Sequence, residues 1–253
     1  MAQVYKDNHE TLEGLLDQAS NAQGASLLIP DLQRPYVWTP LQVIYLVDSL
    51  VRGWPFGSLL LWSVSEQNVA KMPSRQFATM IDRTGGADLV VQQQQAPANY
   101  RMVLDGQQRV QSLLLALGGD SWGFKIEDRV WHEAINQKRP RGRYTHRHWS
   151  VGELCVDLVQ LHLEFEKAKS VPAMEFAKVL QWAIRDPKNG QSPWPKKSNY
   201  DEPLMFAHKN TGRYVRLSRL WNALKGGGIA GISQLKTAAQ NILAEHKVAA
   251  PLD

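Results

Sequence analysis

The sequence predicts an α/β protein of the α+β type, with a small mixed sheet flanked by helices. Short apolar runs at 26–30, 57–62 and 101–105 are bounded by Gly or Pro, as strands commonly are. Segments with apolar residues three and four apart lie between these runs and indicate amphipathic helices. The 253 residues are 43% hydrophobic and 21% charged, which suits a globular chain with a sizeable core and excludes a collagen, a coiled coil or a disordered tail.

The N-terminal elements follow from local patterns. Residues 1–24 predict a short helix with three leucines on one side. The run 26–30 predicts a strand, because it ends at Pro30, which cannot donate a hydrogen bond to a sheet and is typical of strand starts and edges.

The next helix has a marked start. Thr39 can cap it, Pro40 suits the first helical position, and Gln42 completes a capping box, so we expect a helix over 41–52. The run 57–62 that follows is apolar, which predicts a strand covered on both faces.

Residues 63–99 are too long for an ordinary connection, so we expect a variable surface excursion with one added hairpin. The strand 101–105 then passes through Gly106 directly into a helix over 107–119.

The second half is less regular. Alternation within 155–166 predicts a strand pair, or a strand and a turn, with its apolar residues buried, and 171–185 predicts a helix. Three glycines at 226–228 separate a final helix, so we expect one domain over 1–225 and a helical C-terminal extension beginning at 226–253. The chain ends in the pattern of a new strand, so we expect a longer protein.

The corner at 105–109, Asp-Gly-Gln-Gln-Arg, is the first place where chemistry is expected. The open N–H groups of a helix that starts after Gly106 favour an anion such as phosphate. Arg109 can bind phosphate oxygens, Gln107 or Gln108 can position a water, and Asp105 can hold Mg²⁺. An equally weighted alternative is structural, with Asp105 capping the helix and Arg109 in a surface ion pair.

The second candidate segment is 29–38, where Gln33 and Arg34 lie between apolar anchors. Arg34 can meet a second phosphate, and Tyr36 or Trp38 can frame a pocket or stack on a base. The structural alternative makes both aromatic residues core anchors and pairs Arg34 with a carboxylate; for Trp38 this alternative is favoured.

The two segments together, IPxxQRxYxW and DGQQR, resemble the N-terminal domain family of GmrSD-type modification-dependent restriction enzymes, which includes SspE-like sensors of DNA phosphorothioates. The resemblance implies a fold similar to the ParB/sulfiredoxin-like fold and a nucleoside triphosphatase, dependent on Mg²⁺, that controls DNA cleavage. It points to residues 105–109 as the nucleotide and metal site, with Gln33, Arg34 and Tyr36 beside it.

The sequence departs from the family pattern in two ways. The excursion at 63–99 is longer than expected, and no histidine-metal nuclease half is recognisable among the seven histidines. We therefore expect that this chain alone does not cut DNA by a histidine-metal mechanism, and that a C-terminal nuclease domain or a partner subunit supplies cleavage.

The charge of +5 comes from one place. Residues 138–149 hold five basic residues and no acid, so the remainder is formally neutral. A basic loop with Pro and Gly suits a DNA backbone, although a solvated loop is the commoner role of such runs. The expected DNA-binding residues are Lys138, Arg139, Arg141, Arg143 and Arg147.

The sequence also bears on the cellular location of the protein and on the functions it could have. No apolar signal core or membrane-length apolar run occurs, and the single cysteine excludes an intramolecular disulfide, so we expect a cytoplasmic protein, with homo-oligomerisation left open. The leading hypothesis is that the protein is a nucleotide-hydrolysing sensor of modified DNA. The rivals are a non-hydrolytic DNA-binding module, a ParB-like nuclease that acts on DNA directly, and an interaction domain for a partner subunit.

Overall fold

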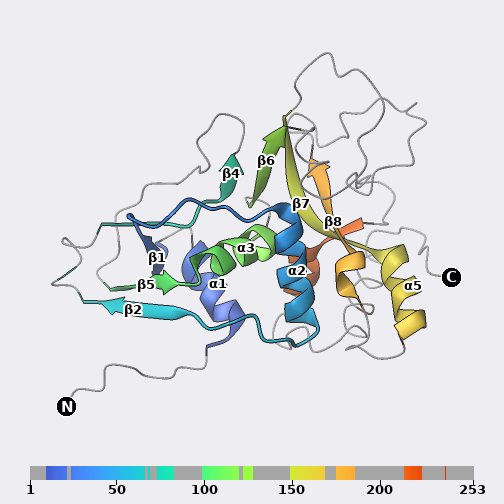
Figure 1. The fold of residues 1–253 in the computed structure, drawn as a ribbon, viewed down its shortest axis with the longest axis horizontal. Coiled ribbons are helices and arrows are strands. Elements are labelled where there is room, and N and C mark those ends of the chain that lie inside the picture. Colours follow the sequence, from blue (N-terminus) through green and yellow to red (C-terminus); the bar gives the residue numbers. More distant parts are fainter. Residues whose placement is uncertain are drawn as a thin grey trace.

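A computed structural model gives an α+β protein, which confirms the expected class, with two small sheets around a shared set of helices (Figure 1). The structure describes residues 10–21, 24–65, 68, 73–82, 99–119, 122–127, 149–168, 175–185, 214–223 and 237. The basic run at 138–148 and almost all of the expected C-terminal extension lie outside these residues, as does 83–98 of the excursion.

The first sheet has the order β2-β5-β1-β3 and carries the candidate site. Its strands are β1 (Leu27–Pro30), β2 (Leu60–Val64), β3 (Ser74–Arg75) and β5 (Tyr100–Asp105). β1 and β5 run parallel, whereas β2 and β3 are antiparallel to their neighbours, so this sheet is mixed as predicted.

The second sheet is built mostly from the C-terminal half. Its strands are β4 (Met80–Asp82), β6 (Gly123–Glu127), β7 (Trp149–Asp157), β8 (Leu180–Arg185) and β9 (Tyr214–Arg216). β7 is the longest of them and pairs with β6, β8 and β9, all antiparallel, while β4 joins the edge beside β6.

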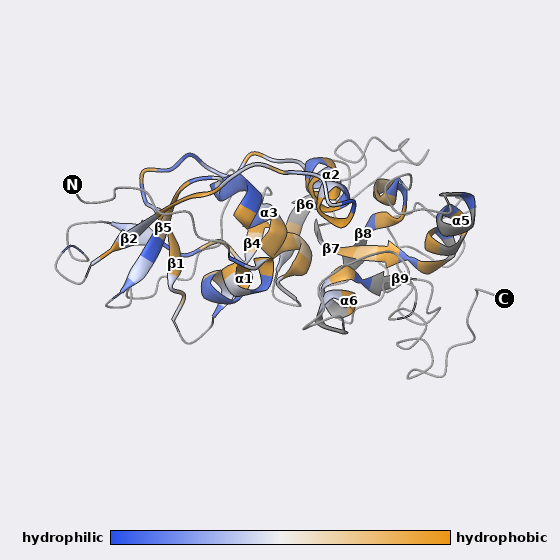
Figure 2. Cartoon of the chain, turned by 90° about the horizontal axis from the view of Figure 1, so that it is seen from below, coloured by the Kyte–Doolittle hydropathy of each residue, from blue (hydrophilic) through white to orange (hydrophobic). Residues whose placement is uncertain are grey.

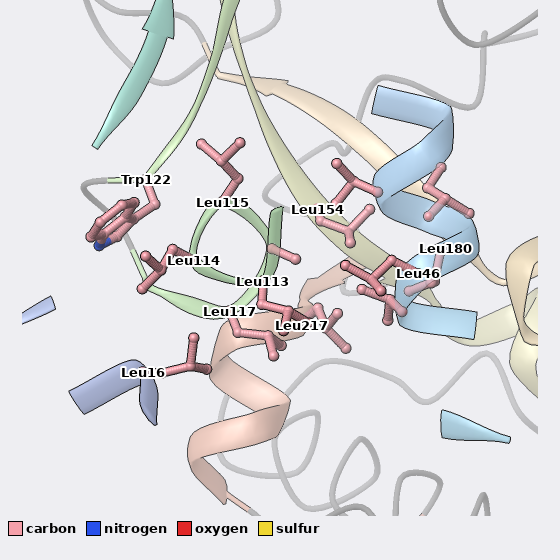
Figure 3. Close-up of a cluster of buried hydrophobic side chains, with 14 of the residues drawn as sticks. Leu16, Leu46, Leu113, Leu114, Leu115, Leu117, Trp122, Leu154, Leu180 and Leu217 are labelled. Carbon is pink, nitrogen blue, oxygen red and sulfur yellow. The ribbon is translucent and has the colours of Figure 1, made fainter. Parts of the chain in front are cut away.

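The helix α3 (Gln107–Leu117) is the centre of the core. Every residue of α3 except Arg109 is buried, as expected of a helix with neighbours on all sides. Figure 3 shows its leucines meeting side chains of the surrounding helices and of the second sheet. The helices around it are α1 (Leu12–Ser20), α2 (Pro40–Val51) and α6 (Leu217–Ala223). In Figure 2 α1 and α3 lie between the strands β1, β2 and β5 of the first sheet and the strands β7, β8 and β9 of the second, and both carry apolar residues.

The helix starts that the sequence marked are present. In α2 the Thr39 side chain accepts from the Gln42 N–H, and the Gln42 side chain accepts from the Thr39 N–H, which completes the predicted capping box. In α1, whose start was not predicted, Thr11 accepts from the Gly14 N–H. The capping box is local in sequence, so the pattern predicts it directly.

Two expectations in the N-terminal half were wrong. β2 is not covered on both faces: Leu60 and Trp62, which share one face of the strand, are 44% and 38% exposed. The excursion is not wholly a surface segment, since in its described part β3 pairs with β1 and β4 with β6, whereas the expected hairpin falls largely outside the described residues. Phe77, also in the excursion, is buried in the main core.

Two expectations in the C-terminal half were also wrong. The expected strand pair at 155–166 is the end of β7 followed by α5 (Leu158–Ala168), which Asp157 caps by accepting from the Gln160 N–H. Leu163, expected to be buried, is 47% exposed. The expected helix at 171–185 is instead a 3₁₀ turn, Phe176–Lys178, and strand β8, because pairing with β7 overrides the local helical pattern.

The described residues contain no helix that is both long and apolar enough to cross a bilayer.

Candidate functional site

The candidate site surrounds the N-terminus of α3, where β5 ends. Gly106 is the N-cap residue, and its φ of 89° and ψ of 8° lie in the left-handed region that glycine adopts without strain. A Cβ at this position would collide with the Leu59 side chain. Gly106 therefore allows β5 to turn directly into α3.

The first turn of α3 has open backbone donors. Gly106 offers no side-chain cap, and the N–H groups of Gln107 and Gln108 find no acceptor among the described residues. Such donors, together with the helix dipole, favour a bound anion. The structural alternative is confirmed in part: Asp105 does not cap the helix, but its carboxylate forms an ion pair with Arg109.

The Gln33–Trp38 segment lies against this helix end, as the paired motifs predicted. Gln33 Nε2 donates to the Leu104 carbonyl at 3.3 Å, next to the end of β5. Gln107 Nε2 donates to the Arg34 carbonyl at 3.3 Å. Segments more than 70 residues apart in the sequence are thus joined at one corner.

Gln108 has a structural part in this corner. Its Oε1 accepts from the Val37 N–H at 3.0 Å, and its Nε2 donates to the Pro35 carbonyl at 3.1 Å. Both ends of the amide are therefore engaged with backbone, so Gln108 positions the loop rather than a water. In Gln107 only Nε2 is engaged, and Oε1 has no partner among the described residues.

Tyr36 is a buried anchor. It is 3% exposed, and its hydroxyl lies 2.7 Å from the Ser112 hydroxyl, which also donates to the Gln108 carbonyl. Its ring contacts Phe124 with centroids 5.9 Å apart. The structural alternative for this aromatic position therefore accounts for its contacts, although the ring also lines a pocket described below.

Arg109 lies on the side of α3 toward β2. Its Nη1 donates to the Phe56 carbonyl at 3.1 Å, and its Nη2 lies 3.4 Å from Asp105 Oδ2. Gly57, with φ of 96°, passes so close that a Cβ there would collide with the guanidinium. Arg109 is thus held between the α2–β2 loop and Asp105, with 17% of its side chain exposed.

Arg34 is the opposite case. It is exposed, and its guanidinium has no hydrogen bond or ion pair with any residue that the structure describes. The structural alternative, in which Arg34 pairs with a carboxylate, was therefore wrong for this part of the chain. Its cation is free to meet a ligand.

A small pocket lies on the Gln107 side of the helix end. Its enclosed volume is only about 20 Å³, far below the roughly 300–1,000 Å³ usual for a small-molecule site, and it opens to solvent through its mouth. Its lining residues are Ile29, Arg34, Tyr36, Arg75, Phe77, Gln107, Gln108 and Gln111.

The predicted site residues fall on two sides of α3. Successive helix residues are about 100° apart, so Gln107 and Gln111 share one side and Arg109 lies on another. Asp105 and Arg109 do not line the pocket. Arg75 and Gln111 were not predicted as site residues, and nothing in their local sequence marks them, because register and packing place them there.

Asp105 is the residue best placed to hold a metal ion. Its side chain is 74% exposed at the end of β5. No group of three His, Cys, Asp or Glu side chains gathers within the described residues. A single carboxylate still fits Mg²⁺, which keeps several waters and binds through one or two carboxylates plus substrate phosphates.

The chain belongs to the family of the GmrSD restriction endonuclease N-terminal domain, whose pattern matches residues 12–206. It is thus a domain of a restriction system, and the resemblance inferred from the two motifs is confirmed. Over 118 residues it is also 30% identical to the uncharacterized protein MJ0686 of Methanocaldococcus jannaschii. That stretch is 47% of this chain but only 19% of the relative's length.

Proposed function

We propose that this chain binds a nucleoside triphosphate at the N-terminus of α3 and hydrolyses it with Mg²⁺, as the sensor domain of a bacterial restriction system that recognises modified DNA. The observation that carries the proposal is the exposed Arg34 guanidinium, without a partner in the described chain, beside the open N–H groups of Gln107 and Gln108. Family membership and the intact Asp-Gly-Gln-Gln-Arg sequence support it.

The proposed roles follow from which atoms are free. A phosphate would accept from the first-turn N–H groups and from Arg34, which offset its charge. Gln107 Oε1 is available to orient the attacking water, whereas Gln108 keeps the Arg34 loop in place. Asp105 would hold Mg²⁺, which supplies charge stabilisation to the transferred phosphoryl group. Arg109 keeps Asp105 and the Phe56 loop in place.

The test is phosphate release from each of the four ribonucleoside triphosphates, measured for the wild type, Asp105→Ala and Asp17→Ala. Asp17 is an exposed carboxylate on α1, away from the site, and is the matched control. We expect turnover in the wild type and in Asp17→Ala, and at least a tenfold loss in Asp105→Ala. Equal rates in all three proteins would contradict the assignment of Asp105.

The DNA part of the proposal rests on the basic run, whose structure lies outside the described residues. Modified DNA would bind there and shift the domain between states with different nucleotide turnover. Binding should weaken with salt, with a log–log slope near −0.9 for each phosphate neutralised. Affinity that is unaffected by the triple change Arg139/Arg141/Arg143→Ala would remove this surface from the proposal.

A second candidate function is a non-hydrolytic grip on a DNA phosphate. The observation that favours it is the small enclosed volume of the pocket, about 20 Å³, which does not accommodate a whole nucleotide. The same assay separates the two functions, because a grip of this kind gives DNA binding that depends on Arg34 without release of phosphate from any triphosphate.

A further inference from the structure

The pocket contains a second arginine, Arg75, which comes from the excursion and not from either motif. Arg75 lies in β3, opposite Ile29 of β1. The chain just after it is fixed, because Phe77 is 2% exposed and Gln111 holds Ala78 through two hydrogen bonds of 2.9 Å and 2.7 Å. The position of Arg75 is therefore set by packed elements of the fold.

The Arg75 guanidinium is only weakly engaged. Its Nη2 donates to the Gln33 carbonyl at 3.4 Å, which is long for a hydrogen bond. Its Nε lies 4.0 Å from Asp31 Oδ1 and is buried without a hydrogen-bond partner. Leaving a buried donor of a charged group unpaired is unfavourable, so the guanidinium gains stability if it shifts to meet an acceptor.

The surroundings of Arg75 select for an anion. Arg34 and Arg75 both line the pocket, and no carboxylate does. The apolar side chains of Ile29 and Phe77 form part of the wall, which lowers the local dielectric and strengthens attraction to a charged group. Gln107, which is 8% exposed, adds an amide to the same wall.

We propose that Arg75 and Arg34 together bind one phosphate group in this pocket, so that Arg75 is an anion-binding residue outside the Asp-Gly-Gln-Gln-Arg motif. Asp31, 53% exposed, holds Arg75 loosely when no phosphate is bound and competes with the phosphate for it. The inference rests on the proposed function in that the phosphate belongs to a nucleoside triphosphate, and its binding step can be measured without turnover.

The test uses tripolyphosphate as the probe, with binding measured by calorimetry on the full chain and folding checked by thermal unfolding. We expect Arg75→Ala to bind tripolyphosphate at least tenfold more weakly, and Asp31→Asn to bind it a few-fold more tightly because the competing carboxylate is gone. Arg101→Ala is the matched control: Arg101 lies in the same sheet and its side chain is 23% exposed, against 20% for Arg75.

The outcomes separate this inference from the proposed function. Folded Arg75→Ala with wild-type affinity, or Asp31→Asn with weaker affinity, would overturn the inference while leaving nucleotide turnover intact. Binding that depends on Arg75, in a wild type that hydrolyses no triphosphate, would uphold the phosphate site and remove the hydrolytic function. If Arg75→Ala does not fold, Asp31→Asn decides alone. Competition by a DNA oligonucleotide but not by a nonhydrolysable triphosphate would assign the phosphate to DNA.

Discussion

The two sides of the α3 N-terminus use arginine in opposite ways. On the β2 side, the Arg109 guanidinium donates to the Phe56 carbonyl and forms an ion pair with Asp105. On the pocket side, Arg34 has no partner in the described chain and Arg75 has only long contacts. The arginine inside the motif is the one that the fold already uses, so a motif position alone does not tell which cation meets a ligand.

On the pocket side, the side chains of Arg34 and Arg75 are weakly held, whereas the backbone that carries them is firmly held. Gln108 holds the loop that carries Arg34, and Gln111 holds the segment that carries Arg75. Both glutamines come from α3, and each bonds one N–H and one carbonyl of a distant chain segment. The backbone that carries these charged groups is therefore already in place before a ligand arrives, which reduces the cost of binding.

The largest effect on stability is expected from removing the two hydrogen bonds that Gln111 forms with Ala78, because these are more deeply buried than the bonds of Gln108. Gln111→Leu keeps the side-chain volume but leaves the N–H and carbonyl of Ala78 buried and unpaired, and Ala78 is 1% exposed. We expect a loss of about 2–5 kcal/mol in the free energy of unfolding, measured with urea. Gln108→Leu is the comparison and should cost less, about 1–2 kcal/mol, because Val37 is exposed and water can replace the lost bond. A larger cost for Gln108→Leu would show that burial does not set the difference.

A smaller effect separates the two sides directly. Arg109→Ala should lower the free energy of unfolding by about 1–2 kcal/mol, because it removes a charge-assisted bond to the Phe56 carbonyl. Arg34→Ala should change it by less than about 0.5 kcal/mol, since an exposed side chain without partners contributes little. Tripolyphosphate affinity should fall in Arg34→Ala. If Arg34→Ala destabilises the fold as much as Arg109→Ala does, the contrast between the two sides is wrong.

The sequence predicted those parts of the site that local signals determine. The capping box of α2 and the turn at Gly106 each involve residues within a few positions of one another, and both are present as expected. The proximity of the two motifs followed from the family resemblance, and the contact of Gln33 with the Leu104 carbonyl agrees with it.

The remaining features depend on contacts between distant segments. Local composition could not show that Gln108 would bond to Pro35 and Val37 instead of a water, because those partners are 71 and 73 residues away. The excursion is polar and long, which predicts a surface segment. Pairing of β3 with β1 nevertheless places Arg75 in the pocket. For α5 a local signal did exist, since Asp157 before an apolar run with a period near three is a helix start.

The smallest effect concerns the other end of β5, where an ion pair serves the fold and not the site. The hydrogen bond from Arg101 lowers the pKa of Glu10 below its ordinary value of 4.5, and Gln18 adds a second donor. A lowered pKa in the folded state means that this stabilisation is present above pH 4.5 and is lost as the pH falls through the lowered value.

Glu10→Gln should therefore be less stable at pH 7 by at most about 1 kcal/mol, because the pair is partly exposed and screened by solvent. The difference from the wild type should shrink as the pH falls below 4.5, when urea midpoints are compared across that range. Tripolyphosphate affinity at pH 7 should not change, because Glu10 and Arg101 lie at the start of β5 and line no part of the pocket. A fall in that affinity would mean that the site extends along β5, and the separation between fold-holding and ligand-binding cations would then fail.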